Sequence, residues 1–374
     1  MTGRPFLAAL LCLILGASTA SPCVAGAGAQ VDRTELQARL KRVSADLFTR
    51  TDRAQESIRE LKAILAIDPS LAEAHMLLGI AYRGTGSPDL MGEAVAELRQ
   101  ALALDQTLTP ARLYLAYVYL DLGRIDRARD ELQTALEKVP GQPQFLALLG
   151  DAERRLKNPK RAIELLDQAL AADPSFLQAR YYLGLALFDV GQPARAIGEL
   201  ETVVKAGARV ADAYLSLGTA YLDAGRTDAG LEILSQGTHL DAARPDLRIQ
   251  LARAYRLKRR FPQAAAQLEI AAPRIRTTVA SSFAHQPEIE FAYQVETGLL
   301  AAGRGQYGAA ATALKHALEL EPDHGPTHRE ISVVYTKLGN ARLAAQHAAR
   351  AAALGSPVAS GANKTPAATA KDKK

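Results

Sequence analysis

Cysteine is almost absent from this 374-residue sequence, and its two cysteines, Cys12 and Cys23, both lie within the first 29 residues. The remaining chain contains no thiol, which excludes disulfide bonds, cysteine-based metal sites and a cysteine nucleophile there. Tryptophan is absent, and aromatic residues make up only 5% of the chain. Hydrophobic residues nevertheless reach 48%, with abundant alanine. This composition supports a folded core and favours closely packed helices.

The first 29 residues have the pattern of a secretory signal peptide. Arg4 supplies a positive charge, and the apolar stretch 6–17 is too short to span a bilayer comfortably. Small residues before position 30 are compatible with cleavage after Ala29. An uncleaved anchor is the alternative, and lipid attachment at Cys23 is less expected because the residues before it do not fit a lipoprotein signal. We therefore expect a periplasmic or secreted protein of the bacterial envelope.

Positive charge is concentrated at the ends of the chain. Of the net charge of +5, Arg4 contributes one and the residues from Gly355 onward contribute three, which leaves +1 for the rest. A nearly neutral body lacks the basic surface that nucleic acid requires, so we expect no nucleic-acid partner. The Ala- and Lys-rich segment 355–374 is expected to be a disordered tail.

A small residue recurs with a period of 34, and the hexapeptide YLDLGR at 119–124 returns as YLDAGR at 221–226. The period-marking positions are Ala94, Ala128, Ala162, Ala196, Gly230, Ala264, Ala310 and Ala344. A leucine usually follows four residues later, and another small residue, such as Gly150 or Gly184, usually lies twelve residues earlier. Such spacings place these residues on one face of a helix, and recurring glycines separate two helices per period.

This pattern resembles the tetratricopeptide repeat, a 34-residue helix-turn-helix unit. The resemblance implies an all-α fold: an α-solenoid of about nine repeats, wound as a right-handed superhelix, over residues 38–354. Residues 30–37 would be a linker, and an insertion around 273–290 interrupts the period. The tryptophan of the repeat consensus is missing, and its position holds residues such as Lys41, His75, Leu146 and Tyr214.

In this family the first helix of each repeat lines the concave face, which binds segments of other proteins. The register predicts that an apolar groove contains Met76, Ile80, Leu113, Tyr117, Leu120, Tyr181, Leu185, Phe188, Leu215, Leu222 and Ile249. The charged residues interleaved with them are Asp121, Asp189, Asp223, Arg154, Arg155, Arg253 and Arg256. The alternative interpretation is that many of the apolar side chains pack between neighbouring first helices instead of facing a partner.

Two short motifs that resemble enzyme or metal sites lack the sequence context that such sites need. GRGQYG at 303–308 matches a dinucleotide-binding motif by letter but falls between two expected helices, where no strand precedes it. His324 and His328 are four residues apart, but Gly325 and Pro326 lie between them at a repeat junction. We therefore predict no catalytic residues, no metal site and no cofactor.

These observations lead to one main hypothesis and two alternatives. We expect a non-enzymatic scaffold that binds partner proteins or peptide segments and assists assembly of a bacterial envelope complex, with no membrane span in the mature chain. The first alternative is a structural protein that self-associates through its terminal repeats, as a homo-oligomer. An enzyme or a small-ligand binder is the second alternative, for which the sequence offers no constellation of residues.

Overall fold

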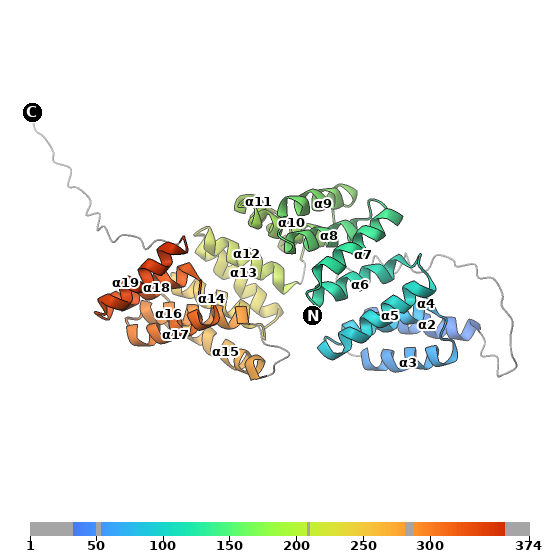
Figure 1. Cartoon of the computed structure of the whole chain (residues 1–374), viewed down its shortest axis with the longest axis horizontal. Coiled ribbons are helices and arrows are strands. Elements are labelled where there is room, and N and C mark those ends of the chain that lie inside the picture. The colour runs from blue at the N-terminus through green and yellow to red at the C-terminus, as the bar shows by residue number, and fades with distance from the viewer. Residues whose placement is uncertain (1–32, 50–53, 208–209, 281–286, 356–374) are drawn as a thin grey trace, which may run out of the picture. The chain divides into compact units, whose positions relative to one another are not determined.

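The computed structural model describes residues 33–49, 54–207, 210–280 and 287–355 (Figure 1). In these residues the chain forms eighteen α-helices and one short 3₁₀-helix and contains no strand. The helices pair into nine consecutive hairpins, which confirms the predicted all-α solenoid of helix-turn-helix repeats. They fall into two compact units, unit 1 (Met1–Ala220) and unit 2 (Tyr221–Lys374).

Most helices contain 13 or 14 residues. Unit 1 contains α2 (Arg33–Thr49), α3 (Ala54–Ile67), α4 (Ala72–Gly84), α5 (Met91–Leu104), α6 (Thr109–Asp121), α7 (Ile125–Lys138), α8 (Pro143–Arg155), α9 (Pro159–Ala172), α10 (Leu177–Asp189) and α11 (Pro193–Lys205). The unit boundary falls inside α12 (Ala211–Asp223). Unit 2 continues with α13 (Thr227–Leu240), α14 (Pro245–Leu257), α15 (Phe261–Ala280), α16 (Pro287–Gly303), α17 (Tyr307–Leu320), α18 (Gly325–Lys337) and α19 (Ala341–Ala353).

The glycines that separate the two helices of a hairpin adopt left-handed backbone conformations. Their φ angles lie between 68° and 77° at Gly86, Gly123, Gly191, Gly225, Gly305 and Gly339. Glycine reaches this region without a steric penalty, so it reverses the chain cheaply. Lys157 and Arg259 occupy the same turn position in two other hairpins, with φ of 66° and 56°. These two turns are therefore strained relative to the rest.

Small residues allow the two helices of each hairpin to approach closely. A Cβ atom added at Gly184 would lie 2.9 Å from Cγ of Leu200 and 3.4 Å from the carbonyl oxygen of Ala196. The same contact joins Gly79 to Leu98, Gly150 to Leu166 and Gly298 to Leu314. In the last hairpin the Ser332 hydroxyl donates a hydrogen bond to the Ala344 carbonyl at 2.9 Å. The small residue, alanine and leucine of the sequence period therefore form one packing contact.

The position that lacks tryptophan carries a cationic or imidazole side chain in several repeats. Arg180 on α10 contacts Glu199 on α11 at 2.9 Å and donates to the Pro174 carbonyl, also at 2.9 Å. His75 makes the equivalent pair of contacts with Glu97 and the Pro69 carbonyl. Each side chain thus ties its own hairpin to the junction that precedes it. Polar bridges take the place of a large aromatic ring here.

The irregularities in the period have local structural counterparts. The three extra residues of the second repeat lie near a 3₁₀-helix, η3 (Pro88–Leu90), between α4 and α5. At the insertion, α15 extends to 20 residues and includes Pro273, while residues 281–286 lie outside the described part. The first helix of the described part, α2, begins at Arg33, inside the segment expected to be a linker.

The predicted signal peptide (1–29) and nearly all of the predicted tail (355–374) lie outside the described residues. Among the helices that are described, none combines the length and apolar character needed to cross a membrane.

The close approach at Gly184 predicts that alanine substitutions at two glycines of the same hairpin change the unfolding free energy in opposite directions. Gly184→Ala forces Leu200 to move, and we expect a loss of about 1–3 kcal/mol of unfolding free energy. Gly198→Ala is the control, because its added Cβ would meet nothing within 4 Å, and it should stabilise α11 by about 0.5–1 kcal/mol. Urea denaturation followed by circular dichroism measures both. Equal effects would contradict the assigned packing.

The strained turn at Lys157 predicts a stabilising substitution. Lys157→Gly removes the left-handed strain but adds chain entropy to the unfolded state, so we expect a net gain of up to about 1 kcal/mol. Lys315→Gly, at an exposed position inside α17, should instead cost about 1 kcal/mol. Thermal melting of the two variants compares them directly, and a destabilising Lys157→Gly would show that the lysine side chain compensates for its backbone.

Candidate functional site

The inner face of unit 1 is formed by the first helices α4, α6, α8 and α10. Side chains from α6 and α10 meet over α8: the Gln178 amide donates to the Tyr117 hydroxyl at 3.2 Å and to the Tyr182 hydroxyl at 3.0 Å. Since α6 and α10 belong to repeats that are not neighbours, this contact shows that the first helices curve inward over α8. We use the name inner face for this side of the four helices.

Asp151, on α8, lies at the centre of the inner face and is fully buried. Its Oδ1 accepts hydrogen bonds from Nη2 and Nε of Arg154 at 3.0 and 3.2 Å. The Arg155 Nε lies 2.7 Å from Oδ2 on the other side of the carboxylate. Two partly exposed arginines therefore compensate one buried negative charge, as a buried carboxylate requires.

Two ion pairs between successive first helices continue this network. Arg83 on α4 contacts Asp121 at the end of α6 at 2.7 Å, and its guanidinium lies 4.9 Å from the centre of the Tyr117 ring. Arg154 reaches Asp189 at the end of α10 at 3.4 Å. Because the arginines stack on or beside buried groups, they are less exposed than the aspartates that they pair with.

Burial governs the titration of the tyrosines on the inner face. It raises the pKa of Tyr181 to about 12, and it also raises the pKa of Tyr117 and of Tyr182. The Asp151 carboxylate adds to the shift of all three, since an anion disfavours a second negative charge nearby. These hydroxyls therefore stay protonated and act as hydrogen-bonding groups rather than as bases.

The apolar residues predicted to line the groove divide into two sets. Six are buried between helices: Met76, Ile80, Leu113, Leu120, Leu222 and Ile249. Five are partly exposed: Tyr117, Tyr181, Leu185, Phe188 and Leu215. The structure thus supports the packing alternative for the first set, whose side chains a partner cannot reach in this conformation. For the second set, partner binding stays a prediction.

The charged residues predicted on this side are paired rather than free. In unit 2, Arg253 contacts Asp223 at 2.6 Å, and Arg256 holds Glu296 through two contacts at 2.6 and 3.1 Å. Glu296 is buried, and desolvation raises the pKa of its carboxyl group despite the arginine. Arg154 and Arg253, both predicted site residues, therefore serve first as structural cations.

Sequence reasoning missed Asp151, Gln178 and Tyr182, which hold the inner face together. One signal was available for Asp151. It occupies the register position that holds Ile80, Tyr117 and Leu185 in the nearby repeats of unit 1, so it is a charge where those repeats carry apolar or aromatic side chains. The partnership of Gln178 with Tyr117 had no such signal, because it joins residues 61 positions apart.

The motifs set aside at first have structural roles in unit 2. The GRGQYG segment turns between α16 and α17, with Gly305 in the left-handed region. His324 caps α18 by accepting from the Thr327 amide, while His328 contacts the Pro322 carbonyl instead of joining His324. Within the described residues, no cluster of three or more histidine, cysteine or acidic side chains is arranged to hold a metal.

Comparison with known proteins identifies the repeats. The family model of the tetratricopeptide repeat matches four overlapping segments, 92–143, 113–176, 147–200 and 181–245. Residues 92–245 thus match the tetratricopeptide repeat model. This stretch includes α6, α8 and α10, and thus most of the inner face. A search of curated proteins finds no match to the chain.

Solved structures share the fold at low sequence identity. The Cut9–Hcn1 hetero-tetramer of APC/C matches with a TM-score of 0.65 and 16% identity, over 87% of this chain and 61% of that one. Human IFIT1, in a dimer with m7Gppp-AAAA, gives 0.57 and 17%, over 86% and 72%. A tetratricopeptide repeat protein from Parabacteroides merdae gives 0.51 and 16%, over 64% and 93%. The chain thus spans less than two thirds of the Cut9–Hcn1 chain, and these likenesses establish the fold alone.

Two aspartates of the inner face should differ strongly in their contribution to stability. Asp151→Ala leaves two arginines without their buried partner, and we expect a loss of about 2–4 kcal/mol. Asp189→Ala removes a partly exposed partner of Arg154 and should cost less than about 1 kcal/mol. Guanidinium chloride denaturation at neutral pH compares the two. Similar losses would mean that Asp151 is not the centre of the network.

Proposed function

We propose that this protein is a scaffold that binds a segment of a partner protein on the inner face of unit 1. Tetratricopeptide repeat proteins generally mediate protein–protein interactions, and residues 92–245 match the model of such repeats. The observation that carries the proposal is a row of partly exposed large side chains on α10, Tyr181, Leu185 and Phe188, with Tyr117 nearby on α6. Their spacing of four and then three residues places them on one side of the helix.

The chemistry of this row suits protein recognition. Aromatic side chains supply large contact areas at low entropic cost, and tyrosine and arginine are frequent among the residues that dominate binding energy. This row of large side chains lies beside the ion pair between Arg154 and Asp189, which supplies a polar border. The surface therefore suits an extended or helical segment with a few apolar side chains.

The cellular setting belongs to the same proposal. A signal-like segment at residues 1–29 supports export, and assembly of a bacterial envelope complex is the role that we propose for an exported scaffold of this kind. The proposal also assigns no enzymatic activity to the chain. The inner face supports that assignment, because its buried carboxylate is neutralised by arginines and its tyrosines are held protonated.

The proposal is tested by affinity capture from envelope extracts with three versions of the full mature chain. These are the wild type, a Tyr181→Ala/Phe188→Ala variant, and an Ile67→Ala/Leu104→Ala control that removes exposed apolar side chains outside the inner face. Loss of two central anchors should reduce retention of a specific partner about tenfold or more, since such a truncation costs about 2 kcal/mol. The control should retain the partner fully.

Circular dichroism and thermal melting must first show that each variant is folded. A partner lost by the inner-face variant and kept by the control supports the proposal. Equal retention by all three versions overturns it. Recovery of only a second copy of this chain would favour self-association instead.

A further inference from the structure

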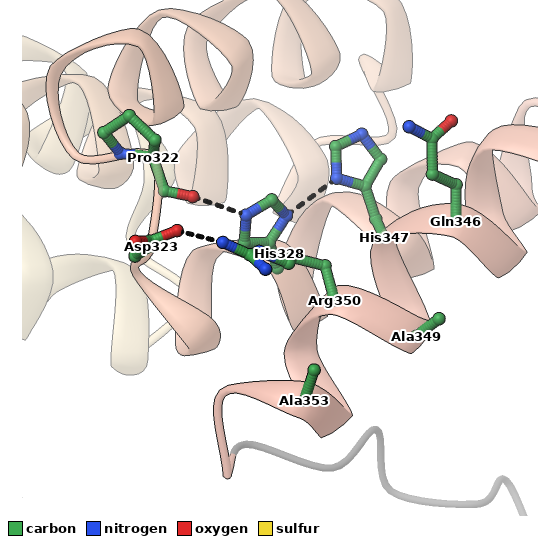
Figure 2. A pocket seen from close by; sticks show the side chains of 8 residues that line it. All are labelled: Pro322, Asp323, His328, Gln346, His347, Ala349, Arg350 and Ala353. Atoms are coloured by element: carbon green, nitrogen blue, oxygen red, sulfur yellow. Dashed lines mark hydrogen bonds and ion pairs between the residues drawn. The ribbon is translucent and has the colours of Figure 1, made fainter.

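The last hairpin contains a pair of histidines in direct contact. His328 on α18 and His347 on α19 place their Nδ1 atoms 2.8 Å apart (Figure 2). The Nε2 atom of His328 lies 2.8 Å from the Pro322 carbonyl oxygen, in the junction before α18. His328 is buried and His347 is partly exposed. The pair therefore joins three segments of the terminal repeat: the junction, α18 and α19.

The geometry fixes where the protons lie. A carbonyl oxygen can only accept, so Nε2 of His328 carries a hydrogen. A neutral His328 then has a bare Nδ1, which accepts the hydrogen that His347 donates from its own Nδ1. The second ring nitrogen of His347 points away from His328 (Figure 2), so a proton taken up there keeps the bond but leaves a positive charge on a partly buried ring beside His328, which weakens the closed state. A second extra proton has only Nδ1 of His328 to occupy, and there it would break the bond.

The groups that face the pair offer little compensation for added positive charge. Asp323, in the junction, is the nearby carboxylate, but it is paired with Arg350 on α19. The ring of Tyr335 stacks on His347 at 5.6 Å between centres and carries no charge. A pocket of about 590 Å³ lies beside the pair, and its lining consists of the two histidines, Pro322, Asp323, Gln346, Ala349, Arg350 and Ala353. Water in that pocket can reach an opened pair.

We propose that the His328–His347 pair is a pH-sensitive latch that holds the terminal hairpin closed near neutral pH and releases it in mild acid. The latch concerns unit 2 and does not depend on partner binding by unit 1. Release would loosen α19 from α18 and the junction. The array would then present a different terminal surface in acidic surroundings.

The direction of the pH effect follows from linkage. Burial lowers the pKa of His347, and the neighbouring His328 lowers it further. The folded hairpin therefore binds fewer protons than the unfolded chain, whose histidines titrate near pH 6.5. The contribution to stability is complete above about pH 6.5 and is lost as the pH falls below that value toward the lowered pKa of the folded state.

Hydrogen exchange of the full chain, followed by mass spectrometry at about pH 7.5 and about pH 5, tests the latch after correction for the intrinsic exchange rate. Exchange in α18–α19 is compared with exchange in α8–α9, a hairpin of unit 1 that contains no histidine. Acid should speed exchange in α18–α19 selectively, by about tenfold for each unit by which the pKa is depressed. No selective change would overturn the proposal.

Two variants separate the latch from general effects of histidine. His347→Gln does not titrate, and its amide can donate to a neutral His328 or, after a flip, accept from a protonated His328, so the selective acid response should disappear. His239→Gln removes an exposed histidine of α13 and should leave the response unchanged. A response that persists in His347→Gln contradicts the proposal. If that variant fails to fold, nitrogen NMR of the wild-type imidazoles decides, because the latch requires a hydrogen on Nδ1 of His347 and none on Nδ1 of His328.

Discussion

The contact between a small residue on the first helix and a leucine on the second is the constraint on which the rest of the structure depends. At Gly150 and Gly184 the first-helix backbone nearly touches the facing leucine side chain, with no room for an added Cβ. Because the helices approach closely, one leucine side chain fills the space between them. Successive first helices then lie near enough for their side chains to contact each other. Much of the buried aliphatic core is a consequence of this spacing.

In several repeats the absence of tryptophan is compensated by polar bridges. Arg180 and His75 each connect the facing helix of their own hairpin with the carbonyl that ends the preceding junction. Such a bridge is directional, because it needs an acceptor side chain on the facing helix and a carbonyl at the junction. His328 keeps the same position and the same carbonyl contact but finds His347 where other repeats offer a carboxylate. One register position thus yields an ion bridge in one repeat and a titratable pair in another.

The sequence was sufficient to predict the contacts within one repeat, but it was insufficient to predict how tightly successive repeats stack. The hairpins, their turn glycines such as Gly191, and the Gly184–Leu200 contact all follow from a period of 34, because they join residues within one unit. Burial of Met76 and Leu113 was foreseen only as an alternative, since the same register position faces a partner or a neighbouring helix according to how tightly the helices stack. Whether the partly exposed residues of the predicted groove, such as Tyr181 and Phe188, can contact a partner depends on the same stacking of the helices.

The hydrogen bond between Gln178 and Tyr117 means that unit 1 is not held together by contacts between neighbouring repeats alone. In an ideal solenoid each repeat contacts only its neighbours, so stability is a sum of local terms. Here Gln178 spans two repeats, and Asp151 beneath it raises the pKa of both Tyr117 and Tyr182. Disturbing α8 therefore affects α6 and α10 together. A segment bound across these helices would contact α6, α8 and α10 as a coupled surface, because their polar groups all interact with the buried carboxylate of Asp151.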